Sequence, residues 1–170
     1  MLILIASVFG AVSTVTAATA TAATVPAEIA VPTGNKAAMT LVGAGDLTYE
    51  CKAKPDGTGH EWTFAGPNAV LTDAKKKTVG KYYAGPTWEH SDGSKVTGKQ
   101  LAVSPNPNAI PLQLVQANPA EGKGMMVGVT YIQRLNTQGG TPPKDPCAAN
   151  NMGAKQTVKY QADYVFFKKN

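Results

Sequence analysis

The C-terminal segment of the chain alternates apolar and polar side chains almost without interruption. In an extended strand successive side chains point to opposite faces. One face of this segment therefore collects Val158, Tyr160, Ala162, Tyr164 and Phe166. After the N-terminal stretch, no helical period persists for ten residues. A chain patterned in this way must bury one face of a sheet, and we expect an all-β protein.

Six further segments rich in β-branched and aromatic residues are expected to form strands. Together with the C-terminal segment they are Ala38–Val42, Leu47–Lys52, Glu61–Ala65, Thr78–Ala84, Leu112–Ala117, Met125–Leu135 and Gln156–Phe167. Turn residues separate them, as at 55–57 and 92–93. Short strands between such turns predict a single-domain antiparallel β-barrel or β-sandwich and argue against βαβ units.

The first residues of the chain, Met1–Ala23, carry no charge. The apolar run Leu2–Phe9 is typical of a secretory signal peptide, and the small residues at 18–22 fit its cleavage site, although no Lys or Arg precedes the run. A membrane anchor, the alternative, needs roughly 20 predominantly apolar residues, and this run gives way to Thr, Ala and Ser sooner. We therefore expect residues 1–23 to be a signal peptide and residues 24–170 to be a secreted domain, extracellular or periplasmic.

Cys51 and Cys147 are the two cysteines of the chain. No C-x-x-C or H-x-x-x-H spacing accompanies them, so a metal site is not expected. In an exported protein an isolated pair of cysteines indicates a disulfide. A bridge over such a sequence distance would stabilise the fold by roughly 4–5 kcal/mol in the chain-entropy model, and we expect it to fasten the whole domain.

Seven stretches form an ordered series along the chain. They are Val31–Lys36, Tyr49–Cys51, Lys81–Glu89, Asp92–Gly98, Ala109–Leu112, Ile132–Gly140 and Tyr160–Phe166. In order and spacing the series resembles the secreted bacterial and fungal family known as domain of unknown function 3455. The likeness spans nearly the whole expected mature chain and implies export and paired cysteines, but no defined activity. Tyr82 stands where relatives often have His and Leu112 where they often have Trp, so roles tied to those side chains do not carry over.

Some fungal relatives carry a malate dehydrogenase label, which would require a dinucleotide-binding fold. The nearest glycine pattern is Gly43-Ala44-Gly45, but Thr48 replaces the third glycine and no phosphate-binding helix is expected after it. We interpret these glycines as a β-turn and expect no cofactor. Nucleophilic hydrolysis lacks support too, because the chain has no G-x-S-x-G motif and only two histidines, at 60 and 90.

Polar and aromatic residues concentrate before the turn at 92–93. Stacking faces, carboxylates and an imidazole in one place could form a small binding site. The candidate ligand-binding residues are Tyr83, Trp88, Glu89, His90 and Asp92. In the alternative interpretation, which the pattern favours, the aromatic residues fill the core and the charged residues face water beside a hairpin.

Arg134 is the only arginine in a chain with sixteen Lys and Arg residues. It lies in Val127–Leu135, where the alternation places Thr130 and Ile132 on the side opposite to the other apolar residues. A planar guanidinium suits a buried ion pair, for which Asp163 or Glu50 would supply the carboxylate. We expect a structural role for Arg134.

The net charge of +5 comes from lysines that are scattered or in short runs. Nucleic-acid binding calls for a denser basic stripe with stacking aromatics, so neither nucleic acid nor stable membrane insertion after cleavage is expected. The function we predict is a non-enzymatic binding or structural module. One alternative is an extracellular hydrolase of a polysaccharide or other polymer, in which Glu89 and Asp92 would be carboxylates about 5–9.5 Å apart. Another is adhesion to an anionic cell-surface polymer, which salt would weaken.

Overall fold

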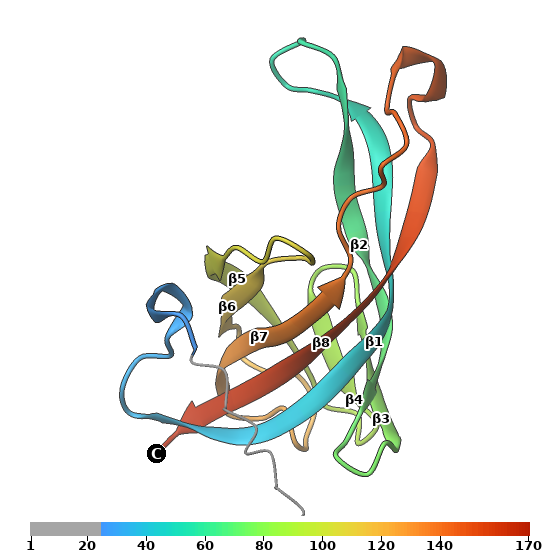
Figure 1. Ribbon diagram of the computed structural model, residues 1–170. Helices are drawn as coiled ribbons and strands as arrows, with labels where there is room; N and C mark the ends of the chain where they lie inside the picture. Colours follow the sequence, from blue (N-terminus) through green and yellow to red (C-terminus); the bar gives the residue numbers. More distant parts are fainter. Residues whose placement is uncertain (1–24) are drawn as a thin grey trace, which may run out of the picture.

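Eight antiparallel strands pair in chain order and close into a barrel in the computed structural model, which describes residues 25–170 (Figure 1). The strands are β1 (Asn35–Ala53), β2 (His60–Thr72), β3 (Thr78–Tyr83), β4 (Thr87–His90), β5 (Lys95–Ser104), β6 (Leu112–Ala117), β7 (Val129–Gly139) and β8 (Lys155–Lys169). Two short 3-10 turns, η1 (Ala27–Ile29) and η2 (Ala149–Asn151), complete the secondary structure. The expected all-β fold is confirmed, as a barrel. The expected signal peptide, residues 1–23, lies outside the described residues.

Strand β1 is continuous where two strands and a turn at Gly43–Gly45 were expected, so the turn prediction is wrong. Gly43 and Gly45 lie in mid-strand because neighbouring groups leave no room for a side chain. A Cβ on Gly43 would lie 2.6 Å from the ring of Tyr164, and one on Gly45 would lie 2.6 Å from the Cα of Ala69. Glycine at 43 leaves room for the ring of Tyr164, and glycine at 45 allows the backbone of Ala69 to approach closely.

Strands β4 and β5 were not expected from the sequence. Strand β4 has four residues, too few for an alternating pattern to be recognised. Strand β5 carries a bulge between Gln100 and Ala102, which interrupts the alternation of inward and outward side chains.

The centre of the barrel is filled by aromatic side chains. Trp88 is 1% exposed, and its ring stacks on Tyr82 with centroids 4.7 Å apart. Tyr164 and Phe166 pack edge-on against Trp88 at 5.6 and 6.5 Å. Outside the wall, the fully buried Ile29 of η1 accepts a hydrogen bond at its carbonyl from Gln133 Nε2 at 2.7 Å.

Strands β1, β2 and β8 continue past the other strands and form a projecting arm (Figure 1). We define the arm as residues 48–66 and 141–159, because β2 pairs with β3 only from Asn68 onward and β8 pairs with β7 only from Tyr160 onward.

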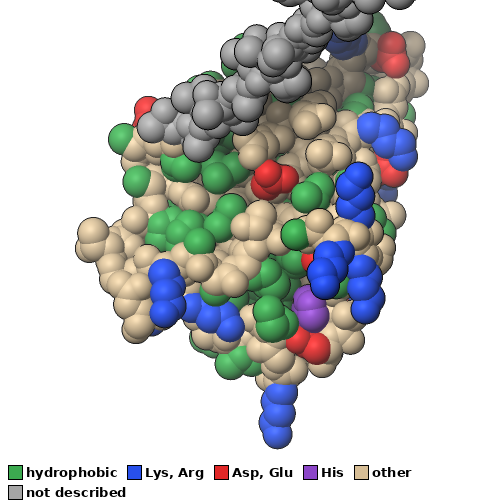
Figure 2. All heavy atoms as spheres, turned by 60° about the horizontal axis from the view of Figure 1, so that its bottom comes forward, with side chains coloured by type: hydrophobic (Ala, Val, Ile, Leu, Met, Phe, Trp, Pro, Cys, Tyr) green, Lys and Arg blue, Asp and Glu red, His purple; other side chains and the backbone are tan. Residues whose placement is uncertain are grey.

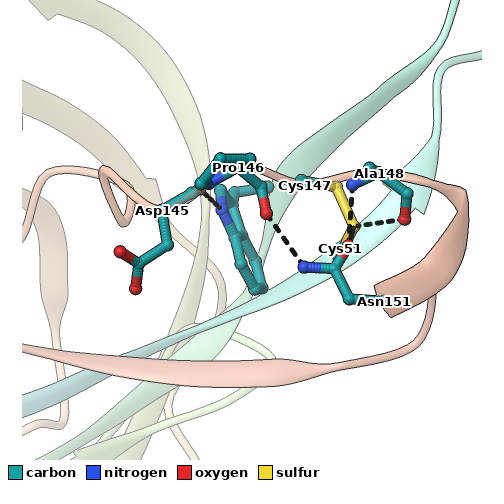
Figure 3. Close-up of a disulfide and its surroundings, with 7 residues drawn as sticks. Cys51, Asp145, Pro146, Cys147, Ala148 and Asn151 are labelled. Atoms are coloured by element: carbon teal, nitrogen blue, oxygen red, sulfur yellow. Dashed lines mark hydrogen bonds between the residues drawn. A yellow bond between two sulfur atoms is a disulfide. The ribbon is translucent and has the colours of Figure 1, made fainter.

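The disulfide between Cys51 and Cys147 is confirmed, with a Cα–Cα distance of 5.4 Å (Figure 3). It lies in the arm and attaches the β7–β8 connection to β1. Trp62 Nε1 donates to the carbonyl of Asp145 at 2.7 Å, and Asn151 Nδ2 donates to the carbonyl of Pro146 at 2.9 Å. Although the bridge spans 96 residues in sequence, in space it fastens the arm and not the barrel interior.

Candidate functional site

The barrel is hollow at the end from which the arm projects. A cavity of about 460 Å³ opens there, and its walls are mainly apolar and aromatic. It is lined by Leu47, Tyr49, Phe64, Ala65, Gly66, Pro67, Tyr82, Gly85, Pro86, Gln100, Ile110, Pro111, Gln113, Val115 and Arg134. An eight-stranded barrel either fills its interior with side chains or leaves room for one small ligand. This barrel is packed at its centre and open at one end, which we call the open end.

Arg134 on β7 points into this cavity. It lies opposite Gln113 on β6 and opposite Tyr164 on β8, and residues directly opposite in an antiparallel pair share a face. Because Tyr164 is completely buried inside the barrel, Arg134 faces inward too. Its Nε and Nη2 donate to the carbonyl of Pro111 at 3.1 and 2.9 Å, which fixes the guanidinium at the cavity wall.

The ion pair expected for Arg134 does not form. No carboxylate of residues 25–170 lies within 4 Å of the guanidinium. Asp163 follows the inward Ala162 and therefore points outward, where it accepts a hydrogen bond from Asn136 at 2.7 Å. Glu50 lies 3.4 Å from Lys52 Nζ. Because side chains alternate between the two faces of a strand, Arg134 points into the barrel while Asp163 points outward. The sequence alone did not show which face of each strand lies inside.

Tyr82, which lines the cavity, belongs to a group of three buried tyrosines inside the barrel. The hydroxyls of Tyr160 and Tyr164 are 3.3 Å apart, and the ring of Tyr82 lies 5.1 Å from that of Tyr164. Burial raises the pKa of all three phenols, and the positive charge of Arg134 opposes that rise in each. These tyrosines are therefore neutral hydrogen-bonding groups at physiological pH.

The remaining polar groups of the open end are also neutral. Gln113 Nε2 donates to Gln100 Oε1 across the β5–β6 pair. The Tyr49 hydroxyl donates to the carbonyl of Gly140 at 2.8 Å. The lining residues include no Asp, Glu, His or Cys, so the open end offers donors and one positive charge but no general acid or base.

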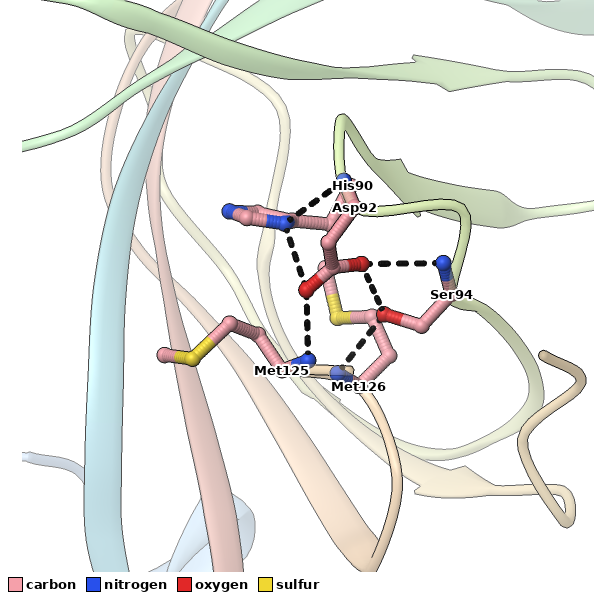
Figure 4. Close-up of polar contacts among 5 residues, drawn as sticks. All are labelled: His90, Asp92, Ser94, Met125 and Met126. Carbon is pink, nitrogen blue, oxygen red and sulfur yellow. Dashed lines mark hydrogen bonds and ion pairs between the residues drawn. The ribbon is translucent and has the colours of Figure 1, made fainter. Parts of the chain in front are cut away.

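The opposite end of the barrel is closed by a loop that Asp92 holds in place (Figure 4). Strand β4 begins after the turn at 85–86, which lines the cavity at the open end, and runs to the other end of the barrel. The turn between β4 and β5 therefore lies at the end opposite the cavity. Asp92 Oδ1 accepts hydrogen bonds from the backbone N–H and hydroxyl of Ser94 at 2.9 and 2.6 Å, and Oδ2 accepts one from Met125 N–H at 2.7 Å. The Ser94 hydroxyl and the Met125 amide hold the pKa of Asp92 far below its ordinary value. We call this region the closed end.

His90, Asp92 and Ser94 are the residue types of a catalytic triad, but their hydrogen bonds run differently. A nucleophilic serine must donate its proton to a histidine. Here the Ser94 hydroxyl donates to Asp92 and accepts from Met126 N–H at 3.1 Å. His90 Nδ1 lies 2.9 Å from Asp92 Oδ2, and Ser94 is completely buried. The arrangement positions the loop at 118–128 and leaves no reactive hydroxyl at the surface.

The five candidate ligand-binding residues fall into three places. Trp88 lies in the core, as described above, while His90 and Asp92 belong to the closed end. Tyr83 and Glu89 lie on the outer wall, where the Tyr83 hydroxyl donates to Glu89 Oε2 at 2.7 Å and lowers the pKa of that carboxyl. Lys81 Nζ lies 3.3 Å from Glu89 Oε1. The structure joins four of these residues in two pairs, buries Trp88 apart from them and does not bring all five into one site.

The surface charge forms no continuous stripe on the face shown in Figure 2, where Lys and Arg side chains lie in separate groups with hydrophobic and acidic side chains between them. Among residues 25–170, no three His, Cys, Asp or Glu side chains converge to hold a metal ion. Within the same residues, no helix has the length and apolar character needed to cross a membrane.

The fold and the cavity together define an up-and-down eight-stranded β-barrel with one closed and one open end. The chain belongs to the family described as "Protein of unknown function (DUF3455)", whose model matches residues 32–168. The resemblance noted in the sequence is thereby confirmed. No curated protein and no solved structure matches the chain.

Sequence reasoning singled out Arg134 but did not place it at a cavity. The expected alternation in Val127–Leu135 is correct from Tyr131 onward, but a bulge between Val129 and Tyr131 shifts the register and places Val129 on the same face as Ile132. Ile132, with 1% exposure, faces inward, and Arg134 shares its face. The sequence did contain one signal for this position. Arg134 is the only arginine and lies two residues after Ile132, so in a strand the two side chains share a face.

Proposed function

We propose that the chain is an exported binding protein that holds one small apolar molecule at the open end of its barrel. The observation that carries this proposal is the cavity of about 460 Å³ at one end of a barrel whose centre is filled by aromatic side chains. Its volume falls within the roughly 300–1,000 Å³ of small-molecule sites. Apolar walls with a few placed polar groups are also typical of such sites.

The composition of the cavity wall favours binding over hydrolysis. Glycoside cleavage requires two carboxyl groups on either side of the bond, and the wall contains none. Glu89 and Asp92, the carboxylates considered for a hydrolase, are each engaged by neighbouring side chains away from the cavity. A binding module therefore accounts for more of the observations than a hydrolase.

Export remains part of the proposal, with residues 1–23 removed and residues 24–170 as the mature domain. The disulfide supports it, since such bonds persist in oxidising compartments. Expression of the full chain in a secreting host should yield a mature protein whose intact mass begins near residue 24. A secreted or envelope protein that retains Met1 would contradict cleavage.

Binding can be tested with N-phenyl-1-naphthylamine, a neutral apolar dye whose fluorescence rises in apolar surroundings. We expect saturable binding and a change in tryptophan emission, because Tyr82 lines the cavity and stacks on Trp88. Ala65→Trp, at the cavity wall, should weaken dye binding about tenfold or more by occupying the space. Ala53→Trp, an equal change at an exposed residue outside the lining, should not. Equal dye affinity in the two variants would refute the proposal.

A further inference from the structure

We infer that the open end selects a ligand with one anionic group, a carboxylate or sulfonate, whose charge is bound by Arg134 and whose apolar body fills the cavity. This inference rests on the proposed function and names its ligand class.

The first argument is the unbalanced charge of Arg134. The guanidinium lies inside the barrel wall with no carboxylate of the described residues within 4 Å, and residues 1–24 contain no Asp or Glu. Of its five N–H donors, two are directed to the carbonyl of Pro111. Its neighbour across the strand pair, Tyr164, is a neutral phenol that also accepts a hydrogen bond from the guanidinium and cannot balance its charge. Arg134 is half-buried, so its charge is screened less than that of a fully exposed residue, and an anion arriving through the cavity would balance it.

The second argument is the sign of the surroundings. The cavity wall has no acidic side chain that would repel an anion. Gln100, Gln113 and Tyr82 supply neutral polar groups beside the guanidinium. A planar guanidinium binds carboxylate and related oxyanions through two parallel hydrogen bonds, which a lysine cannot reproduce. A cationic ligand would meet only repulsion at this position.

The third argument is the apolar remainder of the wall. Leu47, Phe64, Ile110 and Val115 form surfaces that a small inorganic anion would leave unfilled. An apolar body joined to the anionic group would displace water from those surfaces, with a gain proportional to the area covered. The wall therefore favours an amphipathic monoanion over phosphate or acetate.

Two dyes that differ by one sulfonate test the inference directly. They are 1-anilinonaphthalene-8-sulfonate and the neutral N-phenyl-1-naphthylamine, and we expect the wild-type protein to bind the sulfonate more tightly. Arg134→Met should weaken sulfonate binding about tenfold or more, the range of a hydrogen bond to a charged group, and change neutral-dye binding less than about twofold. Lys99→Met removes an equal charge from an exposed residue outside the cavity lining and should affect neither dye.

The outcomes separate this inference from the proposed function. Failure of the neutral dye to bind the wild-type protein would refute the binding function and the inference together. Neutral-dye binding without any preference for the sulfonate, or an unchanged preference in Arg134→Met, would overturn only the role of Arg134. Neutral-dye binding by Arg134→Met also shows that its cavity is intact, so loss of sulfonate binding in that variant cannot come from unfolding.

Discussion

The two ends of the barrel differ in whether their charged side chains are paired within the protein. At the closed end, Asp92 receives hydrogen bonds from Ser94 and Met125, and each of its oxygens is engaged by the protein itself. At the open end, Arg134 faces a cavity, and no carboxylate of the described residues balances it. A charged side chain whose hydrogen bonds are made within the protein, such as Asp92, stabilises the fold. A charged side chain without a counter-ion beside a cavity, such as Arg134, is available to bind a ligand.

The largest effect should come from removing the disulfide, which fastens the arm at the open end. Replacing Cys51 and Cys147 together by Ser should lower the free energy of unfolding by about 4–5 kcal/mol in the chain-entropy model. Urea unfolding measures this loss. Limited proteolysis should cleave the double variant first within 141–154, because that connection loses its attachment to β1. First cleavage in the loop at 118–128 would show that the closed end is the weaker one.

Removing the central aromatic ring should come next. Trp88→Ala creates a cavity at a completely packed position and should cost about 3–5 kcal/mol, measured by thermal or urea unfolding. Trp88→Phe is the matched control. It retains a ring and removes an indole N–H that has no hydrogen-bond partner among the described residues, so its cost should be much smaller. Equal costs for the two variants would contradict the packing explanation.

At the closed end, Asp92→Asn should lower the free energy of unfolding at pH 7 by about 2 kcal/mol, since hydrogen bonds to a charged acceptor are weakened. The folded-state pKa of Asp92 is held far below its ordinary value, so its contribution is complete above the ordinary pKa near 4, declines below that pH and is lost only when the pH falls through the folded-state pKa. Urea unfolding at pH 7 and pH 3 should therefore show a smaller difference between the wild-type protein and the variant at pH 3, without full convergence. Asp163→Asn, at an outward carboxylate bonded to Asn136, is the control. A difference that is equal at the two pH values would assign the effect to something other than charge.

The smallest effect should be at the wall of the open end. Gln113 lines the cavity, and its hydrogen-bond partner Gln100 is exposed and can bond to water instead, so Gln113→Leu should change the free energy of unfolding by less than about 0.5 kcal/mol. The same unfolding measurement checks it. A loss as large as that of Asp92→Asn would mean that the cavity wall is as structural as the closed end.

Much of the fold could be predicted from the sequence because its evidence is local. The alternation from Val158 to Phe166 identified β8, and the limits expected for β6 match those observed. The two cysteines in an expected secreted chain indicated the bridge that the structure contains. By contrast, Gly43 and Gly45 were interpreted as a turn because the sequence does not show that Tyr164 and Ala69 approach them.

The candidate site depended on information that no single segment carries. Tyr83, Trp88, Glu89, His90 and Asp92 are close in sequence, but the barrel sends Trp88 inward, Tyr83 and Glu89 outward, and His90 and Asp92 to the closed end. The lining of the open end comes from β1, β2, β3, β5, β6 and β7 and the connections between them. Its residues become neighbours only when the sheet closes.

The strand character of most segments and the pairing of the cysteines were determined by the sequence alone, since alternation of side chains and the number of thiols are properties of the chain itself. Closure into a barrel, the cavity and the inward direction of Arg134 were decided by the tertiary structure. The physical reason is register: the bulge between Val129 and Tyr131 exchanges the two faces of a strand, and only pairing with β6 and β8 determines which face lies inside.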